Sequence, residues 1–204
     1  METGNDEFAL GSRVVRRRAA VTRELLDAAW RLIERDGVAV LTLRELAAQL
    51  GMRPQSLSEY FPSKSELLDA LFRDGFSQAT ERLLGLPQGG DPRVDLVNTV
   101  SDFLDFCVSN PGRFQLMLQR AVPGFTPSPE SLRCSGASLQ IMLERAASAG
   151  VRDAADVDLL RALISGLASE QIANEPGGRR FISQAERAVT LVLTGQRNPP
   201  GPTG

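Results

Sequence analysis

The chain of 204 residues has no histidine, two cysteines, one tryptophan and one tyrosine. The absence of histidine excludes a Ser-His-Asp triad, a Cys-His dyad and any zinc site with histidine ligands, and two cysteines cannot supply a four-cysteine site. The sequence also lacks a paired acidic motif and a glycine-rich loop followed by Gly-Lys-Ser or Gly-Lys-Thr. We therefore expect no catalytic residues, no metal site and no cofactor.

Long apolar runs are missing too, since none approaches the eighteen or so residues of a membrane-spanning helix. The first twelve residues are acidic and polar, whereas a signal peptide is basic and then apolar. We expect a cytoplasmic protein that does not enter a membrane. Cys107 and Cys134 lie in apolar, helical patterns, which favours buried thiols over a disulfide.

The net charge of −2 conceals an uneven distribution. Residues 11–65 contain ten Lys and Arg against six Asp and Glu, and the rest of the chain is acidic. A basic end on an acidic body is typical of a protein that contacts nucleic acid.

Apolar residues recur with helical spacing from about residue 16 to residue 194, and no segment has the alternation of a strand. The pattern predicts an all-α protein. We expect a disordered segment over residues 1–12, a helix-turn-helix DNA-binding domain over 13–64, a connecting helix and linker over 65–90, a helical effector-binding and dimerisation domain over 91–197, and a disordered tail over 198–204.

Two capping boxes frame the helix-turn-helix. Thr42 and Glu45 begin a short helix that Gly51 ends, and Pro54 begins a second helix with Leu57 and Phe61 on its inner side. A second capping box at residues 63–66 begins a longer helix. The outward residues of the second helix are all polar, as insertion into the major groove requires: Gln55, Ser56, Ser58, Glu59 and Tyr60. A helical corner on a fold that never touches DNA would have the same pattern.

The pattern at residues 41–68 resembles the TetR family of bacterial transcriptional regulators. Ten residues match its signature in register: Thr42, Leu46, Ala47, Gly51, Leu57, Tyr60, Phe61, Ser63, Lys64 and Leu67. Arg53, Gln55 and Ser58 depart from it, and Ser58 replaces a tyrosine that commonly contacts phosphate. The resemblance implies that Lys64 contacts phosphate, and we expect Arg53 to take over the lost contact.

We predict DNA contacts from both short helices and from the basic segment that precedes them, which would otherwise be a solvated helix start. The predicted residues are Arg13, Arg16, Arg17, Arg18, Thr42, Arg44, Arg53, Gln55, Ser56, Glu59, Tyr60 and Lys64.

Two segments of the second half, residues 111–131 and 158–181, look like the C-terminal domain of one TetR subgroup, the WHG type. They contain a loop at 120–131 and a turn at 173–178 that match it. That subgroup often has a Trp and a His before the glycine equivalent to Gly166, where this chain has Leu160 and Ser165. Large flexible or aromatic residues on inward faces predict an effector pocket, although they could equally form an ordinary core: Phe103, Cys107, Phe114, Met117, Phe125 and Met142.

The last two helices have broad apolar surfaces, which predict a homodimer interface at Leu160, Leu163, Leu167, Val189 and Val192. The alternative is that both helices cap a monomeric core. We expect a repressor that a small, largely apolar effector releases from its operator. A DNA-binding protein without an effector and a small-molecule enzyme on an all-α scaffold are the alternatives.

Overall fold

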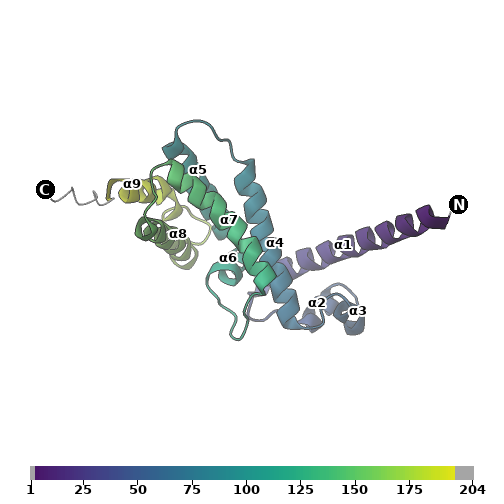
Figure 1. Ribbon diagram of the computed structural model, residues 1–204. Coiled ribbons are helices and arrows are strands. Elements are labelled where there is room, and N and C mark those ends of the chain that lie inside the picture. The colour runs from purple at the N-terminus through teal and green to yellow at the C-terminus, as the bar shows by residue number, and fades with distance from the viewer. Residues whose placement is uncertain (1–2, 196–204) are drawn as a thin grey trace.

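The computed structural model describes residues 3–195, and this part of the chain is helical with no strand, which confirms the all-α prediction (Figure 1). The α-helices in chain order are α1 Thr3–Asp36, α2 Leu43–Gln49, α3 Pro54–Ser58, α4 Lys64–Gly85, α5 Pro92–Ser109, α6 Pro111–Leu118, α7 Pro129–Ser148, α8 Ala154–Asn174 and α9 Ala185–Gly195. A 3₁₀ turn, Ile182–Gln184, precedes α9. The predicted tail at 198–204 lies outside the described residues.

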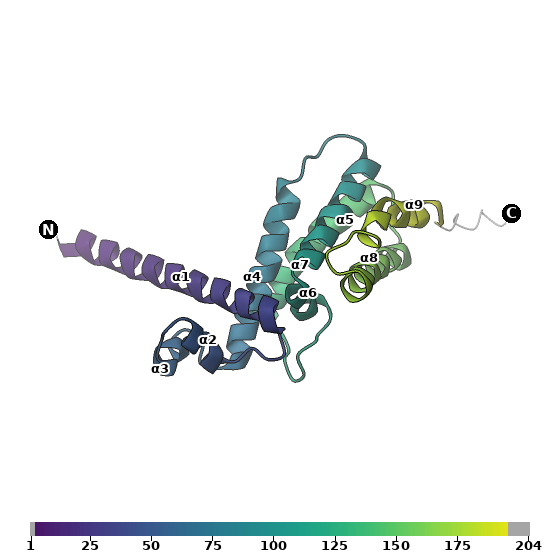
Figure 2. The same ribbon diagram turned by 180° about the vertical axis from the view of Figure 1, so that it is seen from behind.

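Helix α1 is longer than its apolar pattern predicts, because it begins at Thr3 and includes most of the segment expected to be disordered. That expectation was wrong. A helix that is already nucleated by packing extends at little cost through residues without an apolar face, since propagation is far easier than nucleation. The N-terminal part of α1 accordingly projects away from the rest of the molecule (Figures 1 and 2).

The predicted boundaries of α2 and α3 follow from their caps. The Glu45 amide donates to Thr42 Oγ1 at 3.1 Å, and the Thr42 hydroxyl donates to the Glu45 carboxylate at 2.9 Å. Gly51 ends α2 with a φ of +62°, a conformation that glycine adopts without steric cost. Helix α3 is short and ends at Ser58, and the Phe61 amide continues its last turn by donating to the Leu57 carbonyl.

Helices α1 to α3 and the first half of α4 share one core. Its central side chains are at most 2% exposed: Leu25, Leu46, Leu57, Leu67 and Leu71. The second half of α4 leaves this core and runs alongside α5 and α7 (Figure 1). Helices α8 and α9 pack against α5 on the side of the molecule far from α1 to α3 (Figure 2). One helix, α4, therefore belongs to both halves.

Arg145 of α7 fastens the far end of α4. The side chain is 7% exposed and donates to the Leu83 carbonyl in the last turn of α4 and to Thr99 Oγ1 of α5, the latter at 2.6 Å. No carboxylate is among these partners. Carbonyl and hydroxyl oxygens thus compensate much of the cost of burying this guanidinium.

Trp30 and Arg113 form the junction between the halves. Trp30 of α1 is 4% exposed, and its Nε1 donates to the Asp74 carboxylate of α4 at 2.7 Å. The Arg113 guanidinium of α6 lies 4.9 Å from the Trp30 ring centroid and 5.1 Å from that of Phe106. Burial lowers the pKa of Arg113. Two ring faces supply cation–π attraction that offsets part of this desolvation.

Gly112 lets α6 approach α1 directly, and this contact generates a prediction. A Cβ at residue 112 would lie 2.2 Å from Ile33 Cγ2 and 3.2 Å from the Ile33 carbonyl oxygen. Ile33 is buried and β-branched, so it cannot rotate away. Gly112→Ala should lower the free energy of unfolding by about 1–3 kcal/mol, as measured by urea denaturation.

Gly136→Ala is the matched control, because Gly136 is an exposed position within α7 where an added Cβ meets nothing within 4 Å. It should stabilise the protein by roughly 0.5–1 kcal/mol. A Gly112→Ala protein as stable as the wild type would show that the two helices do not meet as described.

Candidate nucleic-acid interface and ligand cavity

Helix α3 presents a polar surface that two buried side chains hold in place. Leu57 and Phe61 are 0% and 4% exposed and anchor the helix in the N-terminal core. Gln55, Ser58 and Glu59 are exposed on the outer side, and Ser56 is half-buried. Hydrogen-bonding side chains on the open face of a short, firmly anchored helix are what reading of base edges requires.

Arg18 connects α1 to the end of α3. One of its terminal nitrogens donates to the Glu59 carbonyl at 2.8 Å, and the guanidinium lies 5.1 Å from the ring centroid of Tyr60. Part of the donor capacity of Arg18 is thus used within the protein. The sequence predicts Arg18 as a DNA contact, and the structure adds a role in positioning α3.

The other predicted DNA-contacting residues surround α3. Thr42, Arg44 and Arg53 are exposed at the starts of α2 and α3. The Lys64 Nζ donates to the Ala39 carbonyl at 3.1 Å, so this ammonium group also supports the loop between α1 and α2. Arg16 and Arg17 are exposed on α1, while Arg13 belongs to the part of α1 whose side chains are not described.

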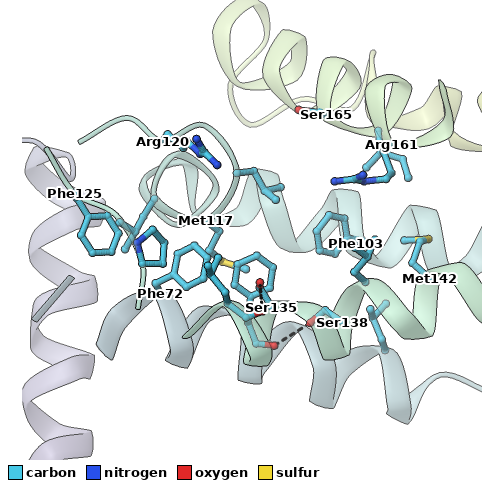
Figure 3. A pocket seen from close by; sticks show the side chains of 18 residues that line it. Phe72, Phe103, Met117, Arg120, Phe125, Ser135, Ser138, Met142, Arg161 and Ser165 are labelled. Carbon is cyan, nitrogen blue, oxygen red and sulfur yellow. Dashed lines mark hydrogen bonds between the residues drawn. The ribbon is translucent and has the colours of Figure 1, made fainter. Parts of the chain in front are cut away.

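A cavity of about 420 Å³ lies in the second half of the molecule, between α4, α5, α6, α7 and α8 (Figure 3). Four of the six residues predicted for the effector pocket line it: Phe103, Met117, Phe125 and Met142. The volume lies within the range of small-molecule sites, which are mostly apolar with a few placed polar groups.

Cys107 and Phe114 do not line the cavity, which corrects the prediction for these two. They are 3% and 2% exposed and belong to the core that α5 forms with α8 and α9. Burial raises the pKa of the Cys107 thiol to about 12, so the group stays protonated and unreactive. Apolar periodicity marks both kinds of inward residue and cannot distinguish a core from a cavity wall.

Several cavity residues were missed by the sequence analysis. Helix α4 contributes Phe72, Phe76 and Leu83, which its pattern marks only as buried. The polar lining residues are Arg120, Ser135, Ser138, Arg161 and Ser165. A polar residue within an otherwise inward-facing stripe is the signal that could have identified Ser138, which is 5% exposed and donates to the Phe76 carbonyl at 3.1 Å.

Asp69 ties the loop between α6 and α7 to α4. Its carboxylate accepts from the Ser128 amide at 2.7 Å and from the Ser128 hydroxyl at 2.9 Å. Burial alone would raise the pKa of Asp69, but hydrogen bonds from Ser128 and Ser131 outweigh it and the pKa is lowered. The loop that carries Arg120, Phe125 and Pro127 is therefore attached to the helix shared by both halves.

The predicted dimer interface requires a correction. Leu160, Val189 and Val192 are at most 2% exposed and lie in the core of a single chain, so they cannot form the contact surface. Leu163 and Leu167 are half-buried. The exposed small and apolar residues of α8 lie on a different face of the helix from Leu160. They recur every three or four positions: Ala155, Leu159, Ala162 and Gly166. Leu159 is 50% exposed, and on α9 Leu191 is 55% exposed.

Within the described residues, no group of three or more Asp, Glu, Cys or His side chains is placed to hold a metal ion. The described helices also include none that is long and apolar enough to cross a membrane.

Comparison with known proteins relates the N-terminal half to regulators of transcription. Residues 25–71 match the family model described as "Bacterial regulatory proteins, tetR family". The chain is 28% identical over 126 residues to the HTH-type transcriptional regulator Rv1816 of Mycobacterium tuberculosis, an alignment that covers 59% of this chain and 48% of the relative. The chain thus spans about half the length of the curated relatives it matches first.

Solved structures share the fold across most of the chain. The putative regulatory protein SCO4313 superposes with a TM-score of 0.71 at 20% identity, over 88% of this chain and 98% of the other. The transcriptional regulator FadR from Bacillus subtilis, solved in complex with stearoyl-CoA, has a TM-score of 0.62 at 18% identity, over 86% and 99%. At these identities the superpositions establish the fold alone.

Proposed function

We propose that this chain is a regulator of the TetR family, which binds operator DNA as a homodimer and represses transcription until a small effector occupies its cavity. The observation that carries the DNA-binding part is the exposed polar face of α3 over the buried anchors Leu57 and Phe61. The basic residues Arg44 and Arg53 flank this face and are exposed to a phosphate backbone.

The exposed face of α8 supports dimerisation. Ala155, Leu159, Ala162 and Gly166 place small or apolar side chains on one side of a 21-residue helix, and an added Cβ at Gly166 meets nothing within 4 Å. Small residues permit two helices to approach closely across a two-fold axis. In the dimer, α8 and α9 of each protomer would form a four-helix interface around Leu159 and Leu191.

The position of the cavity supports control by an effector. Phe72 and Phe76 of α4 line the cavity, and Leu67 and Leu71 of the same helix lie in the helix-turn-helix core. An effector that prefers one position of α4 would change the spacing of the two recognition helices, which must match successive major grooves. FadR shows that a protein of this fold holds an acyl-CoA.

The resemblance of residues 120–131 and 173–178 to the WHG-type subgroup supports the assignment of this chain to that subgroup.

Gln55 and Arg53 are proposed to make different kinds of contact. Gln55→Ala should reduce discrimination between bases by about 1–3 kcal/mol at one base pair of each half-site, as measured by fluorescence anisotropy with duplexes carrying single-base changes.

Arg53→Ala should weaken binding to every duplex alike and lower the slope of log K against log salt concentration by about 0.9. Unchanged discrimination in the Gln55 variant would remove this residue from the base contacts, and sequence-dependent loss in the Arg53 variant would mean that it reads a guanine.

Leu159→Arg tests the dimer interface. Two arginines and their like charges would meet across the two-fold axis, so the variant should be a folded monomer that binds operator DNA at least tenfold more weakly. Sedimentation velocity gives the mass and circular dichroism checks the fold. Val94→Arg, at a 52%-exposed position on α5, is the control and should remain dimeric. A Leu159→Arg protein that still dimerises would refute the assignment of this face.

A further inference from the structure

The charges that line the cavity are of one sign. Its lining consists of thirteen apolar residues, three serines and two arginines, with no carboxylate. Arg120, Arg161 and Ser165 lie along one side of the cavity, and Phe72, Ser135 and Ser138 lie along the opposite side (Figure 3). The cavity thus has a basic edge and an apolar interior.

Arg120 is held at this edge by an unusual backbone. Its φ is +48°, and it is the one residue other than glycine with a positive φ in the described part of the chain. A side chain in this conformation costs on the order of 1–2 kcal/mol, which glycine would avoid. The preceding residue, Gln119, donates from Nε2 to Ser169 Oγ of α8 at 3.4 Å. The strained turn therefore keeps Arg120 beside the helix that carries Arg161.

Neither guanidinium is neutralised by a strong partner. Arg161 pairs with Asp158 of its own helix at 3.3 Å, but the side chains are 55% and 73% exposed, so water screens this pair and it contributes little. Arg120 forms no ion pair with the side chains that the structure describes. The edge of the cavity therefore has two hydrated guanidinium groups next to a large apolar surface.

We propose that the cavity binds an amphipathic anion, with an apolar chain among Phe72, Phe103 and Met117 and one carboxylate or phosphate group between Arg120 and Arg161. The inference rests on the proposed function in treating the cavity as the effector site, and it narrows the effector to this chemical class. The planar fork of a guanidinium matches the oxygens of a carboxylate or phosphate, and the hydroxyl of Ser165 on the same side adds a further donor.

Other head groups fit this edge poorly. A cationic head would meet two like charges at this edge. A neutral ligand would remove water from both guanidinium groups without replacing the lost hydrogen bonds. Among ligands with the same apolar chain, the cavity should therefore bind those with an anionic head group more tightly than those with a cationic or neutral one.

Calorimetric titration of the full chain with four probes that share a ten-carbon chain tests the head group. Decanoate and decyl phosphate should each bind at least tenfold more tightly than 1-decanol, and decyltrimethylammonium should bind most weakly. The tighter of the two anions identifies the preferred head group. Equal affinity for decanoate and 1-decanol, or tighter binding of the cation, would overturn the proposal.

Substitutions at the basic edge test the assigned residues. Arg120→Gly keeps the positive φ and removes the cation, and Arg161→Gln removes the other cation. Each should weaken decanoate binding by about tenfold and leave 1-decanol unchanged. Arg152→Gln, at an exposed arginine that does not line the cavity, is the control and should bind like the wild type. A double variant that still prefers decanoate would show that these arginines do not hold the head group.

These titrations contain no DNA, so they separate the two proposals. A preference for anions that depends on Arg120 and Arg161, together with no release from DNA, would support the binding site and contradict its role in regulation. Release from DNA by a ligand without this preference would support regulation and contradict the anion site. Thermal melting of each variant confirms that it is folded.

Discussion

Helix α4 packs in both halves of the molecule, and the rest of the structure depends on this double role. The first part of α4 supplies Leu67 and Leu71 to the helix-turn-helix core, and the second part supplies Phe72 and Phe76 to the cavity wall. No linker separates these parts, because α4 is continuous over 22 residues. Close-packed interiors do not deform smoothly, so a shift of α4 that accommodates a ligand has to be absorbed where α4 supports the short helices α2 and α3.

Helix α6 provides a second connection between the halves. Leu116 is 3% exposed in the N-terminal core and also lines the cavity, and Gly112 brings the same helix against Ile33 of α1. Arg113 lies between these two residues and contacts the rings of Trp30 and Phe106. A ligand in the cavity would therefore touch two helices, α4 and α6, that also pack in the N-terminal core, which gives the proposed regulation a physical path.

Local chemistry allowed much of the fold to be predicted. Capping residues such as Thr42 and Ser63, and glycines with positive φ such as Gly51, set helix ends without help from the rest of the chain. Periodicity identified which residues face inward but not what they face, which is why Cys107 and Val189 were assigned to a pocket and an interface and lie in cores. The cavity combines five helices and a loop, an arrangement that depends on tertiary packing. The strained backbone of Arg120 likewise has no sequence signature.

Selection of bound duplexes from a randomised DNA library tests whether α3 of a two-fold symmetric protein reads base sequence. We expect enrichment of one sequence made of two inverted half-sites whose centres are about one helical turn or a multiple of it apart. The affinity for that sequence should be at least 10³-fold above the affinity for unselected DNA at physiological salt, as is typical of specific binding. Bound duplexes with no enriched sequence, or with a single half-site and no symmetry, would contradict this expectation.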